Sequence, residues 1–369
     1  MSMSPELKAI LKRMAIPAVF LSVVTVVWWQ RGQEAKEQWA QQAEAQQPLT
    51  SLWGETMGTT WTVRIPGELN PEAHERLQKA ITQALEGVNQ SMSTYLPTSE
   101  ISRFGEQPVD VAFEASPLFF EVMSAAQQVH KESEGAFDPT VGPLVQLWGF
   151  GPDPSRSDLP ADEDIGSALA RVDFGAISFG EDAAGGKTLT RSRDDIRVDL
   201  SAIAKGYAVD RVAQTLEQAG HLSYMVEVGG EIRVGQAKPA SQSQGEGSPW
   251  RIAVERPTQE GGVFQVVPMT QAAMATSGDY RNFFTVDGQR FSHTIDPKTG
   301  RPVEHTLASV SVLHSSCMMA DAYATALSVM GPEQGMAFAE QQGLAVLMLV
   351  RDGEQLQALR SSNFPAPQQ

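Results

Sequence analysis

The sequence predicts an α+β protein with largely antiparallel sheets flanked by helices. The first observation is that strand-like apolar segments come in adjacent pairs around turn signals such as Asp287-Gly288 and Asp352-Gly353, which are typical of β-hairpins. The second is that segments whose apolar residues have helical spacing lie between these pairs. Hairpins interrupted by helices favour antiparallel sheets over a run of parallel βαβ units.

The N-terminal residues predict a membrane-anchor helix. Lys8, Lys12 and Arg13 precede an apolar run over residues 14–29, which has about the length of the apolar region of a signal sequence. No small-x-small cleavage site follows the run directly, so an uncleaved signal anchor is favoured over a cleaved signal peptide. The basic flank then stays in the cytoplasm and the rest of the chain is exported.

The chain is expected to have four parts. These are a signal anchor (1–31), a polar stalk rich in Gln, Ala and Glu (32–50), a single large domain (51–360) and a disordered tail (361–369).

Helix boundaries in the large domain follow from capping residues. Asn70-Pro71 and Ser116-Pro117 each pair an N-cap residue with proline at the first helical position. Gly135 is expected to end the second of these helices, and two more helices are expected at 316–330 and 332–342. The predicted strands span 59–65, 222–228, 250–255, 283–286, 290–295, 307–313, 344–350 and 355–359.

Composition limits the function. The chain has 28 Lys plus Arg against 44 Asp plus Glu, a formal net charge of −16. This argues against nucleic acid as a partner, because nonspecific binding depends on cationic contacts to phosphate. Any phosphate ligand would need a local cation. Cys317 is the only cysteine, which excludes an intramolecular disulfide and a cysteine metal cluster.

The segment 197–207 is the first candidate site. It reads as a strand that passes into a helix, with Gly220 as the residue after the helix end. Asp199, Ser201 and Lys205 would then lie where free N–H groups and a lysine favour an anion such as a phosphate. The alternative is an ordinary strand-to-helix turn with a solvated lysine.

The helix at 316–330 is a candidate metal site. Asp321 and Thr325 are four residues apart, so both side chains project from one helix face. Carboxylate, hydroxyl and nearby carbonyl oxygens are ligands that Mg²⁺ takes together with substrate phosphate. The alternative is that Asp321 interacts with the helix dipole and Thr325 bonds back to a backbone carbonyl.

His293 is a candidate general base, because its side chain titrates near neutral pH and it lies in a polar turn. A hydrogen-bonded turn histidine is the alternative. Other polar, glycine-rich stretches occur at 55–60, 135–140, 275–280 and 292–300, and each is also an ordinary turn signal.

Taken together, these stretches resemble the ApbE family, the FAD:protein FMN transferases. Eight motifs carry the resemblance in the family order: Thr56-Met-Gly-Thr-Thr60, Met92-Ser-Thr-Tyr-Leu-Pro97, Gly135-Ala-Phe-Asp-Pro-Thr-Val-Gly142, Asp199-Leu-Ser-Ala-Ile-Ala-Lys-Gly206, Glu227-Val-Gly-Gly-Glu231, Ala275-Thr-Ser-Gly-Asp-Tyr280, Ser292-His-Thr-Ile-Asp-Pro297 and Ala320-Asp-Ala-Tyr-Ala-Thr325. They cover the chain from about Thr56 to Met330. The resemblance implies an ApbE-like fold with the ligand in a central cleft.

The resemblance also implies site residues. FAD would be held by Met57, Tyr95, Ala136, Phe137, Asp138, Asp199, Lys205 and Ile295. Mg²⁺ would be held by Asp321, Thr325, the Ala324 region and the carbonyl of Ala202. His293 matches a position that we carry over as the catalytic base.

The implied reaction is Mg²⁺-dependent transfer of FMN from FAD to a threonine hydroxyl of an acceptor protein, with release of AMP. Family acceptors carry a Ser/Thr-Gly-Ala-Thr motif in membrane redox complexes of the NADH:quinone reductase and Rnf types. Family members are exported, so the catalytic domain is expected in the periplasm at the bacterial inner membrane. The chain has no lipobox cysteine, which leaves the apolar N-terminal run as the tether. Two alternatives are a Mg²⁺-dependent FAD pyrophosphatase and a membrane-anchored flavin carrier for electron transfer.

Overall fold

A computed structural model describes residues 48–151, 159–240, 247–258, 260–278, 283–286, 289–353 and 355–367. Residues 49–239 and those from 248 onward form one compact unit. No helix within the described ranges is long and apolar enough to cross a bilayer. The predicted signal anchor (1–31) lies outside these ranges, as does the predicted stalk up to residue 47.

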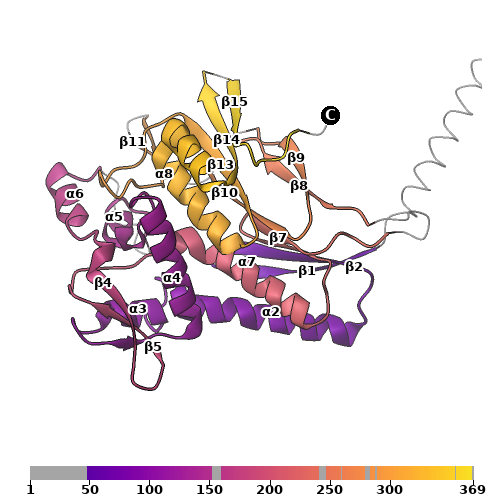
Figure 1. Cartoon of the computed structure of the whole chain (residues 1–369), viewed down its shortest axis with the longest axis horizontal. Helices are drawn as coiled ribbons and strands as arrows, with labels where there is room; N and C mark the ends of the chain where they lie inside the picture. The colour runs from indigo at the N-terminus through magenta and orange to yellow at the C-terminus, as the bar shows by residue number, and fades with distance from the viewer. Residues whose placement is uncertain are drawn as a thin grey trace, which may run out of the picture. The chain divides into compact units, whose positions relative to one another are not determined.

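An eight-stranded antiparallel sheet forms the centre of this unit (Figure 1). Every pair of neighbouring strands in it is antiparallel, as the hairpin signals predicted. In spatial order the strands are β1 (Leu49–Thr56), β2 (Thr59–Pro66), β6 (Met225–Val228), β7 (Glu231–Val234), β10 (Ala272–Gly278), β13 (Leu307–His314), β14 (Ala345–Asp352) and β15 (Gln355–Arg360).

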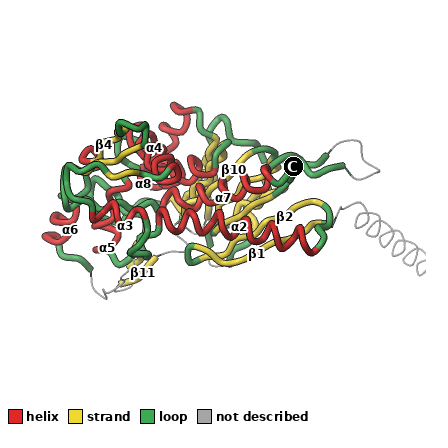
Figure 2. The backbone as a smooth tube through the Cα atoms, turned by 90° about the horizontal axis from the view of Figure 1, so that it is seen from below, coloured by secondary structure: helices red, strands yellow, loops and turns green. Residues whose placement is uncertain are grey.

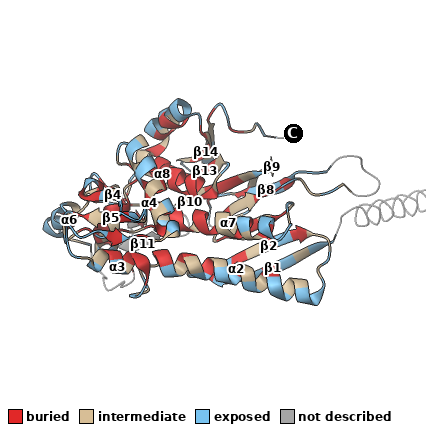
Figure 3. Ribbon diagram, turned by 60° about the horizontal axis from the view of Figure 1, so that its bottom comes forward, coloured by how far each residue is buried: buried red, intermediate tan, exposed pale blue. Residues whose placement is uncertain are grey.

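Each face of the sheet packs against a different layer. Successive side chains along β10 show this, because they point alternately into two different cores. Ala273 and Ala275 belong to the main core, where helices α2 (Pro71–Met92), α7 (Ser201–Gln218) and α8 (Cys317–Gln342) cover one face. Met274, between them, belongs to a second core beneath the hairpin β8 (Trp250–Glu255) and β9 (Val263–Met269). Small side chains toward the helices and a large one toward the hairpin let the helices lie close to the sheet. Figures 2 and 3 show the helices along the strands and their buried inner faces.

The main core continues into a smaller helical region with a three-stranded sheet. Phe104, Phe113 and Phe119 meet edge to face there, at centroid distances of 5.5 to 6.3 Å. Its helices are α3 (Glu100–Glu106), α4 (Pro117–Glu132), η1 (Pro139–Val141), α5 (Gly142–Leu147), α6 (Asp162–Leu169) and η2 (Phe174–Ala176), and its sheet pairs β3 (Phe113–Glu114), β5 (Lys187–Arg191) and β4 (Ile177–Glu181). A separate hairpin pairs β11 (Phe283–Val286) with β12 (Gln289–Ser292).

The predicted helix starts are confirmed by their caps. The Asn70 side chain accepts from the Ala73 backbone N–H at 2.8 Å, and the Ser116 hydroxyl accepts from the Phe119 N–H at 3.2 Å. Each cap satisfies one of the free donors of a helix start.

The two helices predicted at 316–330 and 332–342 are the two halves of α8, which is broken at Gly331 (φ 76°) before Pro332. Proline has no N–H, so the carbonyl of Ser328 lacks its usual partner four residues on. His305 supplies the missing donor: its Nε2 lies 2.6 Å from that carbonyl.

Four expectations differ from the structure. Residues 197–200 form no strand, because Asp199 N–H donates to the carbonyl of Pro139 in another loop instead of to a neighbouring strand. Strand β1 begins at Leu49, inside the predicted stalk. Strand β12 ends at Ser292, before the predicted end at 295. The tail beyond β15 packs down through Phe364, which is 6% exposed in the second core, where disorder was expected from residue 361.

Candidate functional site

The site is built at a close contact between α7 and α8. The Gly206 N–H donates to Asp321 Oδ2 at 2.9 Å, and Asp321 is buried. A Cβ at position 206 would lie 2.7 Å from the Cys317 carbonyl carbon and 2.8 Å from Asp321 Cβ. Only glycine therefore allows this contact.

The proposed metal ligands on the two helices lie around this contact. In a helix the carbonyl of residue 202 faces the N–H of residue 206, so the Asp321 carboxylate lies at the turn of α7 that carries the Ala202 carbonyl. Thr325 is one turn further along α8 and partly exposed, whereas Ala324 is fully buried and adds no side-chain donor.

Lys205 pairs with a buried acid. Its Nζ contacts Glu231 Oε1, at the start of β7, and Glu231 is 3% exposed. The other carboxylate oxygen, Glu231 Oε2, is buried and has no hydrogen-bond partner among the described residues. The alternative that Lys205 is an ordinary solvated lysine is therefore wrong, because Glu231 neutralises part of its charge inside the protein.

These charges perturb one another. The pKa of Glu231 is raised to about 7: burial raises it most, the charge of Lys205 lowers it and the charge of Asp321 raises it. Burial also raises the pKa of Asp321. For Lys205, burial lowers the pKa, but the charges of Asp321 and Glu231 outweigh burial and raise it overall. When both carboxylates are ionised, they and the ammonium of Lys205 sum to −1, and the raised pKa values show that this ionised state lacks a compensating cation.

Two further motifs lie in the β6–β7 turn, which contacts Lys205, and in the β1–β2 turn. Gly229 has φ +59°, and a Cβ on it would lie 2.9 Å from Thr59 Cγ2 and 3.3 Å from Lys205 Cδ. The turn between β6 and β7 thus touches both Lys205 and the start of β2. Met57, at the β1–β2 turn with φ 49°, is partly buried against the main core.

The loop 135–142 lies beside the start of α7. Asp199 N–H donates to the Pro139 carbonyl at 2.7 Å, and Asp199 Oδ1 accepts from Ser201 N–H at 2.8 Å. Asp138 Oδ1 accepts from both the N–H and the hydroxyl of Thr140, at 2.7 and 2.5 Å. Burial raises the pKa of Asp138, partly offset by these bonds. Ala136 and Phe137 are buried.

Two further predicted residues, His293 and Ile295, follow the end of β12. Ile295 is 6% exposed in a small core with Leu144 and Trp148, and Trp148 Nε1 donates to the Gly300 carbonyl at 2.8 Å. The His293 ring is partly buried, 6.3 Å from the Phe150 ring, edge to face.

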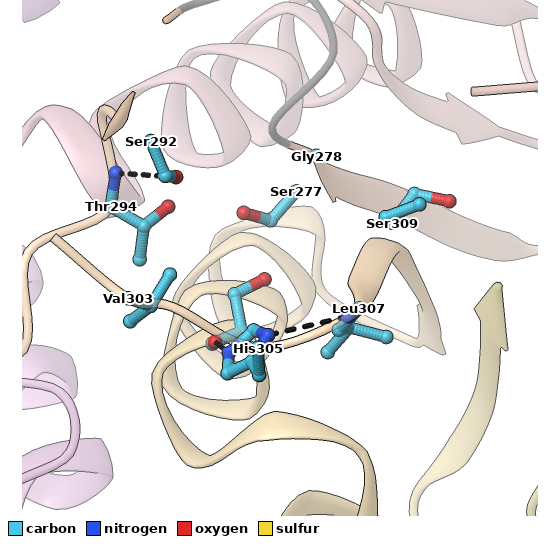
Figure 4. A pocket seen from close by; sticks show the side chains of 10 residues that line it. Ser277, Gly278, Ser292, Thr294, Val303, His305, Leu307 and Ser309 are labelled. Atoms are coloured by element: carbon cyan, nitrogen blue, oxygen red, sulfur yellow. Dashed lines mark hydrogen bonds between the residues drawn. The ribbon is translucent and has the colours of Figure 1, made fainter. Parts of the chain in front are cut away.

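A hollow lined by hydroxyl groups lies next to His293 (Figure 4). Ser292 and Thr294, which flank His293, lie on one side of it and Ser277 and Ser309 on another, and His305 also lines it. Ser328, also in the lining, is one turn beyond Thr325 on α8. The lining therefore includes both sequence neighbours of His293 and a residue of α8 close to Thr325. The lining residues are Ser277, Gly278, Ser292, Thr294, Val303, His305, Leu307, Ala308, Ser309 and Ser328.

The structure therefore joins Lys205, Asp321, Ala202 and Thr325 at one place and sets Asp199 next to Asp138. It leaves Tyr95 on the surface after α2, 64% exposed. Sequence reasoning did not assign a role to Glu231, although its motif was noted. His305 was missed: no local pattern marks a histidine that serves a helix break 26 residues away in sequence.

The donor set suits a hard cation. No group of three or more His, Cys, Asp or Glu side chains within the described ranges could hold a metal. A site here would instead combine the Asp321 carboxylate with hydroxyl and carbonyl oxygens, which fits Mg²⁺ when it keeps water or phosphate ligands. The unpaired Glu231 oxygen and the excess negative charge point the same way.

Comparison with known proteins gives consistent matches. The ApbE family model matches residues 57–348. The chain is 42% identical over 314 residues to a Vibrio cholerae protein named FAD:protein FMN transferase, covering 85% of this chain and 91% of that protein. It is 36% identical over 317 residues to the Escherichia coli K12 protein of the same name, covering 86% and 88%.

Solved structures agree. The flavin transferase ApbE from Vibrio cholerae superposes with a TM-score of 0.76 at 41% identity, covering 86% of this chain and 99% of that one. The apo form of the Pseudomonas stutzeri flavinyl transferase ApbE gives a TM-score of 0.76 at 36% identity, covering 86% and 96%.

Proposed function

The chain belongs to the ApbE family, and on that premise we propose that it is an enzyme that transfers FMN from FAD to an acceptor protein. The finer proposal is Mg²⁺-dependent transfer to a threonine hydroxyl, with release of AMP. The observation that carries it is the buried acidic site at the α7–α8 contact, where Asp321 receives the Gly206 N–H and Lys205 pairs with Glu231.

In this reaction the threonine oxygen forms a bond to the FMN phosphorus, and the bond from that phosphorus to the AMP oxygen breaks. Mg²⁺, when bound, neutralises diphosphate charge and the charge that develops on AMP. Asp321, Thr325 and the carbonyl of Ala202 would hold it. Lys205 lies beside these groups and can contact phosphate oxygens with the third of its side chain that is exposed.

His293 is proposed to take the threonine proton. It lies beside the hydroxyl-lined hollow, between Ser292 and Thr294. A positioned base contributes about a hundredfold to ten-thousandfold in rate. We therefore expect His293→Ala to slow single-turnover FMN transfer within that range while the FAD affinity, measured by fluorescence, changes little. A loss of FAD affinity with an unchanged rate of the bound enzyme would instead indicate a structural turn histidine.

The central test is Asp321→Ala. The variant should lose Mg²⁺ binding in calorimetry and FMN transfer, measured by mass spectrometry of an acceptor domain incubated with FAD and Mg²⁺. Asp352→Ala, an exposed acid in the β14–β15 hairpin, is the control and should keep both. Full transfer by Asp321→Ala without added metal would refute the metal site.

The same assay separates the alternatives. AMP and free FMN formed without an acceptor would indicate an FAD pyrophosphatase, and intact FAD would indicate a flavin carrier. We further propose that the acceptor carries a Ser/Thr-Gly-Ala-Thr motif in a membrane redox complex, and that the catalytic domain faces the periplasm on an N-terminal anchor. Fractionation of cells expressing the full chain tests the location.

A further inference from the structure

We propose that Asp210 is a positioning residue for the metal site: it holds the first turn of α8 against α7 and so sets the register in which Asp321 and Thr325 face Ala202. The inference rests on the proposed function, because it concerns the same Mg²⁺ site. Asp210 is not one of the residues proposed to contact Mg²⁺ or FAD.

The Asp210 carboxylate accepts four hydrogen bonds. Oδ1 accepts from the Cys317 N–H at 3.0 Å and from Arg233 Nη1 at 2.6 Å. Oδ2 accepts from the Met318 N–H at 3.0 Å and from the Ser316 hydroxyl at 2.8 Å. A side chain of α7 therefore binds the free donors at the start of α8, a position that favours a carboxylate.

This contact is in register with the site. Asp210 is four residues after Gly206 on α7, and Cys317 is four residues before Asp321 on α8. The contacts 210 to 317 and 206 to 321 are therefore one helical turn apart on antiparallel helices. A further step of four residues along each helix brings Ala202 opposite Thr325, and these two residues are the remaining proposed ligands.

The register leaves little room for adjustment. The Cys317 N–H is held by Asp210, while the Cys317 carbonyl lies against the bare Cα of Gly206. A shift of α8 along α7 would break the first contact and disturb the second. Arg233, on β7, also anchors Asp210 to the strand that begins at Glu231.

Asp210 could instead serve stability alone, and the chain offers a matched control. Glu100, in α3, is another buried carboxylate that binds the start of a helix from a different element. Its oxygens accept from the Ser116 N–H and the Ser116 hydroxyl, both at 2.6 Å, at the start of α4. Glu100→Gln should cost stability without touching the α7–α8 register.

The experiment measures Mg²⁺ binding by calorimetry and the urea midpoint of unfolding for the full chain, Asp210→Ala, Asp210→Asn, Glu100→Gln and Asp321→Ala. Substitutions that act through the groups around a metal typically weaken its binding about 10- to 100-fold. We expect that loss for Asp210→Ala and a smaller one for Asp210→Asn, which keeps one acceptor oxygen. The Mg²⁺ concentration for half-maximal transfer should rise in parallel, with the maximal rate recovered at high Mg²⁺.

Glu100→Gln should lower the urea midpoint and leave Mg²⁺ affinity within about twofold. The inference is overturned if the Asp210 variants bind Mg²⁺ as the wild type does, or if Glu100→Gln weakens Mg²⁺ to the same degree. If Asp210→Ala does not fold, Asp210→Asn decides by the same measurements. If the wild type does not bind Mg²⁺, the metal site itself is overturned. If Asp321→Ala loses Mg²⁺ binding but both Asp210 variants keep it, only the inference about Asp210 is overturned.

Discussion

Replacing Gly206 by alanine tests how closely α7 and α8 must approach. The added Cβ would lie 2.7 Å from the Cys317 carbonyl carbon and 2.8 Å from Asp321 Cβ, closer than the 3.0 Å below which Cβ contacts essentially do not occur. Two of the three nearest atoms belong to the backbone of α8, which cannot rotate away. The helices must therefore move apart, and the hydrogen bond from Gly206 to Asp321 must lengthen.

The expected magnitude comes from opposing effects. Glycine to alanine inside a helix ordinarily stabilises by about 0.5–1 kcal/mol. Overpacking a dense contact costs about 1–3 kcal/mol, and losing a hydrogen bond to a charged group costs about 1.5–3 kcal/mol. The clash and the lost bond outweigh the helix propensity, so Gly206→Ala should lower the free energy of unfolding by about 2–5 kcal/mol.

Urea unfolding measures the effect, and Gly87→Ala in α2 is the matched control. A Cβ at position 87 would meet only Leu118 Cδ2, at an ordinary 3.9 Å. That variant should be about 0.5–1 kcal/mol more stable than the wild type. If Gly206→Ala proved as stable as the wild type, α7 and α8 could separate freely, and the close contact would not define the site.

Three further outcomes follow from buried polar contacts. Burial raises the pKa of Asp138, so the folded state holds its proton more tightly and the unfolding free energy of the wild type, relative to Asp138→Asn, should fall as pH rises from 4 to 7 in urea titrations. Tyr323→Phe should cost about 1–2 kcal/mol in the same assay, since the hydroxyl donates to Glu132 at 2.5 Å; no loss would mean that the bond is not formed in solution. His305→Ala should cost about 1–3 kcal/mol because the Ser328 carbonyl loses its donor, and a variant as stable as the wild type would show that water replaces the ring.

Local signals in the sequence predicted local structure well. The caps at Asn70 and Ser116 depend on atoms three residues apart, and the hairpin around Gly353 depends on one positive φ. The break at Gly331 was likewise predictable from the Gly-Pro pair. Each of these features is decided within one turn of chain, so the sequence alone carries it.

Features decided by distant partners were not predictable in this way. Residues 197–200 alternate like a strand, but their edge pairs with the loop at Pro139, about sixty residues away in sequence. Strand β1 was not among the predicted strands, and its first two residues lay in the predicted stalk, because its partner β2 provides the reason for its conformation. The family motifs assigned Lys205 to FAD and Asp321 to Mg²⁺, yet neither spacing nor composition showed that Glu231 would take part of the lysine's charge.

That pairing changes the electrostatic argument for a phosphate ligand. From the sequence, Lys205 was the local cation that a chain of net charge −16 would need. In the fold, the charges of Glu231 and Asp321 both act on Lys205, so two carboxylates compete with any phosphate for its charge. When both carboxylates are ionised, a diphosphate placed there would meet net negative charge unless another cation entered with it. The partner that Lys205 already has is therefore an argument for the proposed Mg²⁺ in addition to the spacing of Asp321 and Thr325.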